Sequence, residues 1–325
     1  MNFHAPPKRE DNCYKSIFLL LIGFALVTCT ATVSQAPLPP SPSQIEGNRS
    51  NADRPGRPYE SRSLMSSSGI ERHYLLRLPA GFEQDSCADV IFDFHGAGST
   101  AERQFRNSGF APLADREGII LVYPDANKIY PDQDHRLASY WDGAWEANLR
   151  ERYYDIDFIL ELVESIKNEY CTQDFFATGM SAGGDMVSAL ACLQRTPFRS
   201  FAPVTYRYYN VEECGGAGPR PLLSFHGDAD RIVPIDGFGE PWFDPPMMEV
   251  MRSWAVHNSC DTESLAQRIN DKVVRYYWRN CEAETEWYLM EGGVHVWPGG
   301  ASSIRNRDIS REISASELIW QFFTH

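Results

Sequence analysis

The stretch that most constrains the fold of this chain is residues 175–186, which read F-F-A-T-G-M-S-A-G-G-D-M. Apolar residues typical of a strand come first, then a turn of small residues, then apolar residues at helical spacing. The turn contains G-x-S-x-G, formed by Gly179, Ser181 and Gly183. In such a nucleophile elbow a serine hydroxyl stands above the sheet edge, and the glycines avoid clashes in the tight turn. We expect Ser181 to be a catalytic nucleophile; an ordinary turn of small residues is the alternative.

Strand and helix signals alternate along the rest of the chain. Apolar runs typical of strands occur at 89–94, 119–123, 201–204, 222–225, 273–278 and 286–290, and an edge-strand pattern occurs at 73–78. Helical spacing recurs at 158–166 and 248–258, and a capping box at 314–317 starts a C-terminal helix. This alternation predicts an α/β fold with a mostly parallel, doubly wound central sheet flanked by helices.

The N-terminus has the pattern of a secretory signal peptide, which we assign to residues 1–28. Lys8, Arg9 and Lys15 precede an apolar run at 17–27 that is too short to span a bilayer comfortably. Two cleavage sites compete. The sequence L-V-T-C ending at Cys29 resembles a lipobox and predicts a membrane tether through a lipidated cysteine, whereas S-Q-A ending at Ala36 is an ordinary site. Either one predicts export, to a secreted, extracellular or periplasmic location.

Residues 29–68 are rich in proline and serine and are predicted to be a disordered linker, so that the catalytic domain spans 69–325. The chain has 44 acidic and 30 basic residues, a net charge of −14. A nucleic-acid partner would require basic patches, so none is expected. Nothing in the sequence indicates an obligate protein partner.

The cysteines are interpreted in the light of export. Of the eight cysteines, Cys13 and Cys29 fall in the leader or at the lipid site, and the remaining six are an even number. An even set in an oxidising compartment predicts disulfides, although sequence alone leaves many pairings open. No C-x-x-C or zinc-type spacing is present, so no metal site and no cofactor are expected.

A nucleophilic serine needs a histidine base and an acid that orients the base. The segment F-H-G-D-A-D at 225–230 follows an apolar strand and provides Asp230, with Asp228 as the alternative acid. His295 lies in a glycine-rich loop at 292–300, whereas His257 lies on a predicted helix. Because active-site groups gather at the carboxyl edge of a parallel sheet, we expect a triad of Ser181, Asp230 and His295.

The oxyanion of the reaction needs two backbone N–H donors. The amide of Ala182, directly after the nucleophile, is one candidate. The amide of Ala97 in the loop H-G-A-G at 95–98 is the other. His95 ends a strand and precedes the nucleophile, so we interpret it as a loop-shaping residue rather than a base.

Aromatic residues are dense in two loop regions. They could line a substrate pocket, or they could simply belong to the hydrophobic core. The candidate pocket residues are Trp297, His95, Trp141 and Trp242. Asp155 and Asp157 resemble a catalytic carboxylate pair, but acids are also favoured at a helix N-terminus, and we prefer that interpretation.

Six motifs in a fixed order resemble the secreted family that holds feruloyl esterases and polyhydroxybutyrate depolymerases, within the α/β-hydrolase superfamily. They are H-G at 95, D-I-D-F at 155, G-M-S-A-G-G at 179, H-G-D-A-D-R-I-V-P at 226, W-A to C at 254–260 and H-V-W-P-G at 295. The resemblance implies the same triad of Ser181, Asp230 and His295. It also implies a disulfide between Cys260 and Cys281, makes Cys87–Cys171 plausible and leaves Cys192 with Cys214.

The resemblance implies a secreted serine carboxylesterase that forms an acyl-enzyme, with a feruloylated plant polysaccharide as the favoured substrate. Polyhydroxybutyrate or another polyester is the second candidate, and acetylxylan is the third. A non-enzymatic alternative is an inactive surface protein that binds glycans or aromatic groups. The intact Ser181, Asp230 and His295 favour an enzyme, since a pure binding protein needs none of the three.

Overall fold

The structure is a computed structural model that describes residues 58–126, 128–131, 137–141, 154–209, 211–214, 216–237, 245–301 and 313–325. All of these residues lie in one compact unit, Ser43–His325. The predicted signal peptide 1–28, the lipid site at Cys29, most of the linker and Trp242 lie outside the described residues. None of the helices described is both long and apolar enough to cross a membrane.

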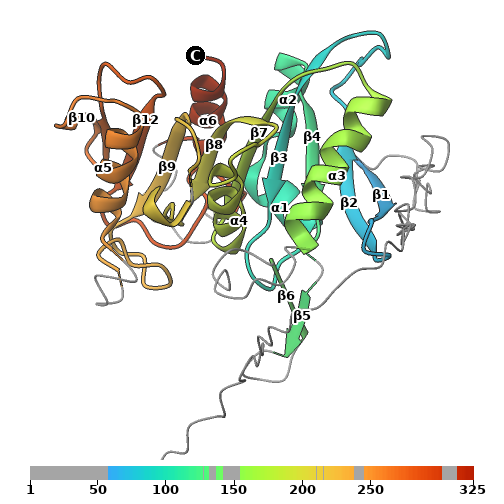
Figure 1. Cartoon of the computed structure of the whole chain (residues 1–325), viewed down its shortest axis with the longest axis horizontal. Coiled ribbons are helices and arrows are strands. Elements are labelled where there is room, and N and C mark those ends of the chain that lie inside the picture. Colours follow the sequence, from blue (N-terminus) through green and yellow to red (C-terminus); the bar gives the residue numbers. More distant parts are fainter. Residues whose placement is uncertain are drawn as a thin grey trace, which may run out of the picture. The chain divides into compact units, whose positions relative to one another are not determined.

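The described part of the domain is built on a ten-stranded sheet in the order β1-β2-β4-β3-β7-β8-β9-β12-β11-β10 (Figure 1). The six strands from β4 to β12 in that order are mutually parallel, and two antiparallel strands extend each end. The ten strands are β1 Glu60–Met65, β2 Glu71–Arg77, β3 Ala88–Phe94, β4 Ile120–Pro124, β7 Thr172–Met180, β8 Phe198–Val204, β9 Leu222–Gly227, β10 Leu265–Asn270, β11 Val273–Tyr277 and β12 Thr285–Met290. A separate antiparallel pair is formed by β5 Lys128–Pro131 and β6 Leu137–Tyr140.

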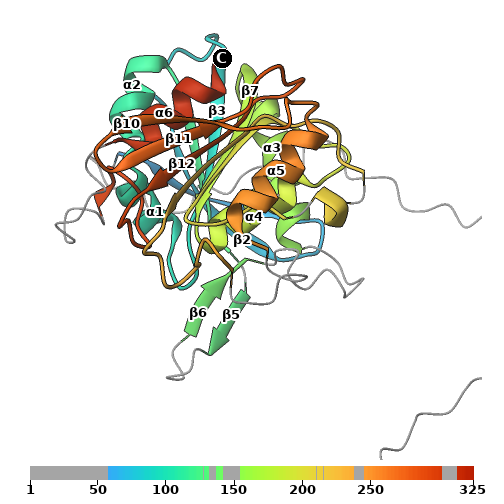
Figure 2. The same ribbon diagram turned by 90° about the vertical axis from the view of Figure 1, so that its left-hand side faces the viewer.

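Helices cover both faces of the sheet (Figure 2). On one face lie α1 Ala101–Ser108, α2 Ala111–Glu117 and α6 Ala315–Phe323, and on the other lie α3 Tyr154–Glu169, α4 Ala182–Ala191 and α5 Met247–His257. A short 3₁₀ helix, η3 Val211–Cys214, follows β8. The prediction of an α/β-hydrolase fold with a mostly parallel, doubly wound sheet is confirmed.

Side chains alternate between the two faces along the central strands. In β3, Val90, Phe92 and Phe94 join the core beneath α3, α4 and α5, whereas Ile91 joins the core beneath α1, α2 and α6. All four are fully buried. A strand buried on both faces has a continuous apolar sequence, which explains why the sequence pattern located the central strands.

The linker boundary predicted at residue 68 is wrong, because β1 begins at Glu60 and pairs along its whole length with β2. Its composition of serine and arginine hides an ordered strand. Arg62 is almost fully buried and forms an ion pair with Glu169 at the end of α3, which satisfies its charge. The strand at 73–78 is also not an edge strand, since β1 covers it.

Three disulfides join the cysteines of the described residues: Cys87–Cys171, Cys192–Cys214 and Cys260–Cys281. These are the pairings that the family resemblance implied. Cys87 and Cys171 immediately precede β3 and β7, which are neighbours in the sheet. This bridge therefore lies at the amino ends of the parallel strands, at the edge opposite the one where strand β7 leads into Ser181.

Candidate active site

The chain turns abruptly at Ser181, between β7 and α4. Ser181 has φ 55° and ψ −120°, a conformation that non-glycine residues rarely adopt. The strained turn is fixed by the hydrogen bond from Ser181 N to the carbonyl oxygen of Val204 at 2.9 Å. Strained backbone of this kind is concentrated at functional sites. Ser181 itself is half-buried.

The elbow lies directly against the loop that follows β3. A Cβ placed on Gly183 would be 2.1 Å from the carbonyl oxygen of Phe94, so no side chain fits there. A Cβ on Gly96 would be 3.4 Å from Cβ of Ser181. The glycines thus bring the backbone of the 95–98 loop against the nucleophile, which is the arrangement that a second oxyanion donor requires.

Asp230 and His295 are hydrogen-bonded to each other. The distance from Nδ1 of His295 to Oδ2 of Asp230 is 2.7 Å. Asp230 follows β9 and His295 follows β12, two adjacent parallel strands, so both residues lie at the carboxyl edge of the sheet. The carboxylate is fully buried, and 13% of the His295 side chain is exposed. A histidine whose Nδ1–H is fixed by a carboxylate has Nε2 free to accept a proton.

The surroundings of Asp230 keep its carboxyl group ionised. Burial acts to raise its pKa, but hydrogen bonds from His226, His295 and Val233 outweigh burial and hold the pKa well below its usual value. Its Oδ1 accepts from the backbone N–H groups of Ile232 at 2.8 Å and Val233 at 3.0 Å. The carboxylate therefore has partners on both oxygens and a fixed orientation.

Asp228, the alternative acid, has another role. Its Oδ1 accepts a hydrogen bond from the backbone N–H of Gly292. It therefore stabilises the start of the loop that contains His295 and does not orient the imidazole ring. Of the two aspartates, Asp230 is the one that forms a hydrogen bond with His295.

The histidine loop reaches the elbow through helix α1. A Cβ on Gly300 would be 2.2 Å from the carbonyl oxygen of Asn107, and the side chain of Asn107 contacts Sδ of Met180, next to Ser181, at 3.3 Å. Within the residues the structure describes, no hydrogen bond joins Oγ of Ser181 to His295. The structure therefore brings the acid and the histidine together and places the serine on the same sheet edge.

His95 and Trp141, both predicted for the substrate pocket, support the 95–98 loop from inside, so that prediction is wrong for them. His95 is 0% exposed and Trp141 is 7% exposed. The indole N–H of Trp141 donates to the carbonyl oxygen of His95 at 2.7 Å. The alternative interpretation of His95 as a loop-shaping residue matches its position. Ala97 itself is exposed.

The prediction that Trp297 lines the pocket is also wrong, because its indole ring lies in the core. It is 0% exposed, packs edge-to-face on Phe110 and donates to Oγ of Ser316 at 3.1 Å. Although Trp297 is only two residues from His295 in the sequence, its ring packs into the core beneath α2 and α6. Trp242 lies outside the described residues.

Asp155 lies in the first turn of α3, as expected of an acid at a helix N-terminus, and it also pairs with Arg72.

Sequence reasoning missed Arg72 and the role of His226, whose Nε2 donates to the carbonyl oxygen of Val233 at 2.6 Å. His226 is a polar residue in the largely apolar strand β9, and that contrast is a usable signal. Arg72 lies in β2, E-R-H-Y-L-L-R, where it does not stand out from its polar neighbours. Among the described side chains, no group of three or more His, Cys, Asp or Glu is arranged to hold a metal ion.

Comparison with known proteins identifies the class. No protein-family model matches the chain. A probable feruloyl esterase C of Aspergillus terreus is 24% identical over 261 residues, 78% of this chain and 84% of that protein. The acetyl xylan esterase of Aspergillus awamori has a similar structure, with a TM-score of 0.51, 16% identity, and coverage of 74% of this chain and 94% of that one. The poly(3-hydroxybutyrate) depolymerase LpqC of Bordetella parapertussis superimposes with a TM-score of 0.50, 16% identity and coverage of 81% and 94%.

The fold and the arrangement of elbow, acid and histidine define an α/β-hydrolase, and the chain is a carboxylic ester hydrolase. The relatives named feruloyl esterase C bear out the resemblance drawn from the sequence, and the likeness to the depolymerase shows a shared fold. The similarity covers most of the described domain.

Proposed function

We propose that the protein is a secreted serine esterase in which Ser181, His295 and Asp230 form the catalytic triad. The observation that supports this most directly is the 2.7 Å hydrogen bond from His295 to the buried carboxylate of Asp230. It lies on the sheet edge where Ser181 occupies a strained elbow. The same three residues emerge from the order serine, acid, histidine along the chain.

The reaction proceeds through an acyl-enzyme. Nε2 of His295 accepts the proton of the Ser181 hydroxyl as Oγ attacks the ester carbonyl carbon. When the tetrahedral intermediate collapses, the C–O bond to the alcohol breaks and His295 returns the proton to the departing oxygen. Water, deprotonated by the same nitrogen, then attacks the acyl-enzyme and releases the acid together with free Ser181. Asp230 holds the imidazole ring in the tautomer that both steps require.

The amides of Ala182 and Ala97 donate to the oxyanion. Ala182 is the first residue of α4, and the first N–H groups of a helix have no partner within the helix. The helix N-terminus also favours negative charge. Ala97 follows Gly96, which lies against Ser181. Two such donors aimed at the developing charge typically account for a large part of the rate.

The favoured substrate is a feruloyl ester of a plant polysaccharide. The relatives named feruloyl esterase C support it, and so does the position of an aromatic residue beside the elbow. A Cβ on Gly184 would be 2.6 Å from Cβ of Tyr206, so this half-buried tyrosine packs against the first turn of α4. An aromatic side chain there suits the phenolic ring of ferulate by stacking.

The test compares hydrolysis of methyl ferulate, a hydroxybutyrate oligomer and acetylxylan by the purified protein. A higher kcat/KM for methyl ferulate than for the other two esters supports the proposal. A higher kcat/KM for one of the other two would contradict the feruloyl ester and assign that ester as the substrate class. Ser181→Ala removes nearly all turnover, whereas the matched change Ser253→Ala, on α5, leaves turnover intact. Failure of a fluorophosphonate to label Ser181, together with glycan binding, would instead indicate an inactive binding protein.

Export completes the proposal. Three disulfides are typical of proteins from oxidising compartments, and residues 1–28 have the pattern of a signal peptide. Mass spectrometry of the mature N-terminus distinguishes a lipidated Cys29 from cleavage after Ala36. An intact N-terminus would contradict export.

A further inference from the structure

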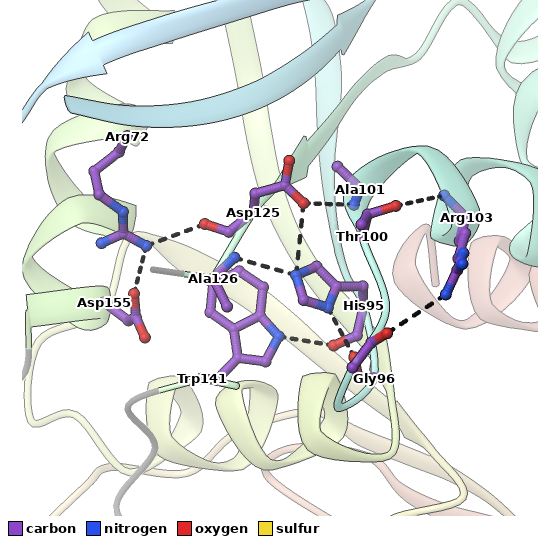
Figure 3. Close-up of polar contacts among 11 residues, drawn as sticks. Arg72, His95, Gly96, Thr100, Ala101, Arg103, Asp125, Ala126, Trp141 and Asp155 are labelled. Carbon is purple, nitrogen blue, oxygen red and sulfur yellow. Dashed lines mark hydrogen bonds and ion pairs between the residues drawn. The ribbon is translucent and has the colours of Figure 1, made fainter. Parts of the chain in front are cut away.

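A buried ion pair lies beneath the loop that follows β3. Arg72 of β2 pairs with Asp155 in the first turn of α3 (Figure 3). Their side chains are only 2% and 1% exposed. The guanidinium group also lies over the ring of Phe158, at 4.1 Å from its centroid. Burying two charges is costly, and a well-packed apolar pair usually gives equal or better stability. The position of this pair therefore suggests a role beyond stability.

The pair is connected to the loop through the two residues that follow β4. Nη2 of Arg72 donates to the carbonyl oxygen of Asp125 at 3.1 Å. The carboxylate of Asp125 accepts from the amide of Ala101 at 2.7 Å, and the amide of Ala126 donates to Nε2 of His95 at 3.1 Å. Asp125 and Ala126 thus hold both ends of the loop from His95 to Ala101 (Figure 3).

The same contacts specify one form of His95. An amide N–H can only donate, so Nε2, which faces Ala126, is unprotonated. Nδ1 lies 2.8 Å from the carbonyl oxygen of Gly96, which can only accept, so Nδ1 has the proton. The imidazole ring is therefore neutral, and burial, which lowers its pKa, favours that form. Trp141 covers the ring, with the two ring centroids 4.9 Å apart.

We propose that Arg72 and Asp155 are positioning residues for catalysis, which fix the Asp125–Ala126 segment and through it the amide of Ala97 that faces the oxyanion. The proposal rests on the serine-esterase function proposed above. Ala97 is exposed and gains no support from core packing, so its position depends on the two fixed ends of the loop. A displacement of about 1 Å at such a site can cost on the order of 100-fold in rate.

The test separates positioning from stability with single and double variants. Arg72→Met and Asp155→Asn each remove one charge of the buried pair and leave the opposite charge uncompensated within it, and both lose stability and kcat. The double variant Arg72→Met/Asp155→Leu regains stability because neither charge remains. It still lacks the donor to Asp125, so its kcat stays roughly 10- to 100-fold below wild type with KM nearly unchanged. Its affinity for a phenylboronic acid, which forms a tetrahedral adduct with serine, falls by a similar factor.

The matched control is Arg77→Met. Arg77 lies on the same strand, is nearly buried and pairs with Asp115 on α2, away from the loop. This variant loses stability but keeps wild-type kcat. Wild-type kcat and boronate affinity in a folded double variant would overturn the proposal. That result is distinct from failure of the serine-esterase function, which would appear as activity retained by Ser181→Ala.

Discussion

Gly227 and Gly293 lie backbone against backbone, so closely that a Cβ on Gly227 would stand 2.2 Å from the carbonyl oxygen of Gly293. The amide of Ala229 donates to that same oxygen at 2.9 Å. Gly227 is the last residue of β9 and directly precedes the loop that contains Asp230, and Gly293 lies two residues before His295. The loop of the acid and the loop of the histidine are therefore one packed unit, and its closeness depends on the absence of side chains.

Gly227→Ala should separate these two loops. We expect kcat on a p-nitrophenyl ester to fall roughly 100-fold, because a shift of about 1 Å between acid and histidine misplaces the base. Overpacking should also cost about 1–3 kcal/mol of unfolding free energy, measured by urea denaturation. The control is Gly218→Ala, where the nearest atom to the new Cβ is 3.6 Å away. Equal activity of the two variants would contradict this interpretation of the contact.

Asp230→Asn should leave the fold intact and remove most activity. The amide oxygen can still accept from Ile232 and Val233, but the –NH₂ group then faces Nδ1 of His295, which favours the wrong tautomer. We expect kcat to fall by roughly 10³- to 10⁴-fold. Asp228→Asn retains an acceptor for the amide of Gly292, so the histidine loop keeps its position. Because Asp228 does not contact the imidazole ring, kcat should fall by less than about tenfold. Similar losses in both variants would remove the distinction between the two acids.

The hydrogen bond between Asp230 and His295 could be anticipated from the sequence, because each residue follows an apolar strand and such strands end at one edge. The burial of Trp297 could not. Its neighbour Phe110 lies far earlier in the chain, and the direction of the ring is set by tertiary packing. The role of Arg72 was hidden for the same reason: Asp125 and Asp155, which it contacts, come from two segments far from it in the sequence.

For the fold, the sequence located the strands that are covered on both faces and missed those whose stability comes from backbone pairing. β10 pairs with β11, yet most of its side chains are exposed and it lacks an apolar run. β1 contains a nearly buried arginine whose charge is balanced by an ion pair from α3. An apolar run in the sequence indicates a strand that is buried in the core. A polar strand that is stabilised by hydrogen bonds to its neighbours has no such run and is not detected in this way.

The three disulfides should contribute unequally to stability. Cys87–Cys171 closes a sequence separation of 84 residues, whereas Cys260–Cys281 closes 21. On the loop-entropy account, replacing the first pair by alanine should cost roughly 4.5 kcal/mol and replacing the second roughly 3 kcal/mol. Urea denaturation measures both. Wild-type kcat is expected for the Cys87–Cys171 variant, because this bridge lies at the sheet edge opposite Ser181. A larger loss from the shorter loop would argue that strain or local packing outweighs loop entropy.

Asp93 in β3 is a buried acid with no place in the proposed mechanism. It is 0% exposed, and its Oδ1 accepts from the side-chain amide of Gln104 at 2.7 Å. Burial raises its pKa to about 8, although hydrogen bonds from Ser108 and Gln104 act in the opposite direction. In the unfolded chain the pKa of an aspartate is about 3.9. The neutral form therefore favours folding: its contribution is fully present below about pH 4 and is lost as the pH rises through 8.

Asp93→Asn removes this ionisation. The wild type should therefore lose stability relative to the variant as the pH rises. Near pH 4.5 the variant and the wild type should differ little, whereas at pH 9 the variant should be more stable by on the order of 5 kcal/mol. Urea denaturation at both pH values measures the difference. Asp115→Asn is the control of opposite sign, because the hydrogen bond from Arg77 lowers the pKa of Asp115. Its contribution is present above about pH 4 and lost at lower pH, so this variant should gain nothing at pH 9. If Asp93→Asn changed stability equally at both pH values, Asp93 would be ionised in the folded protein across this range.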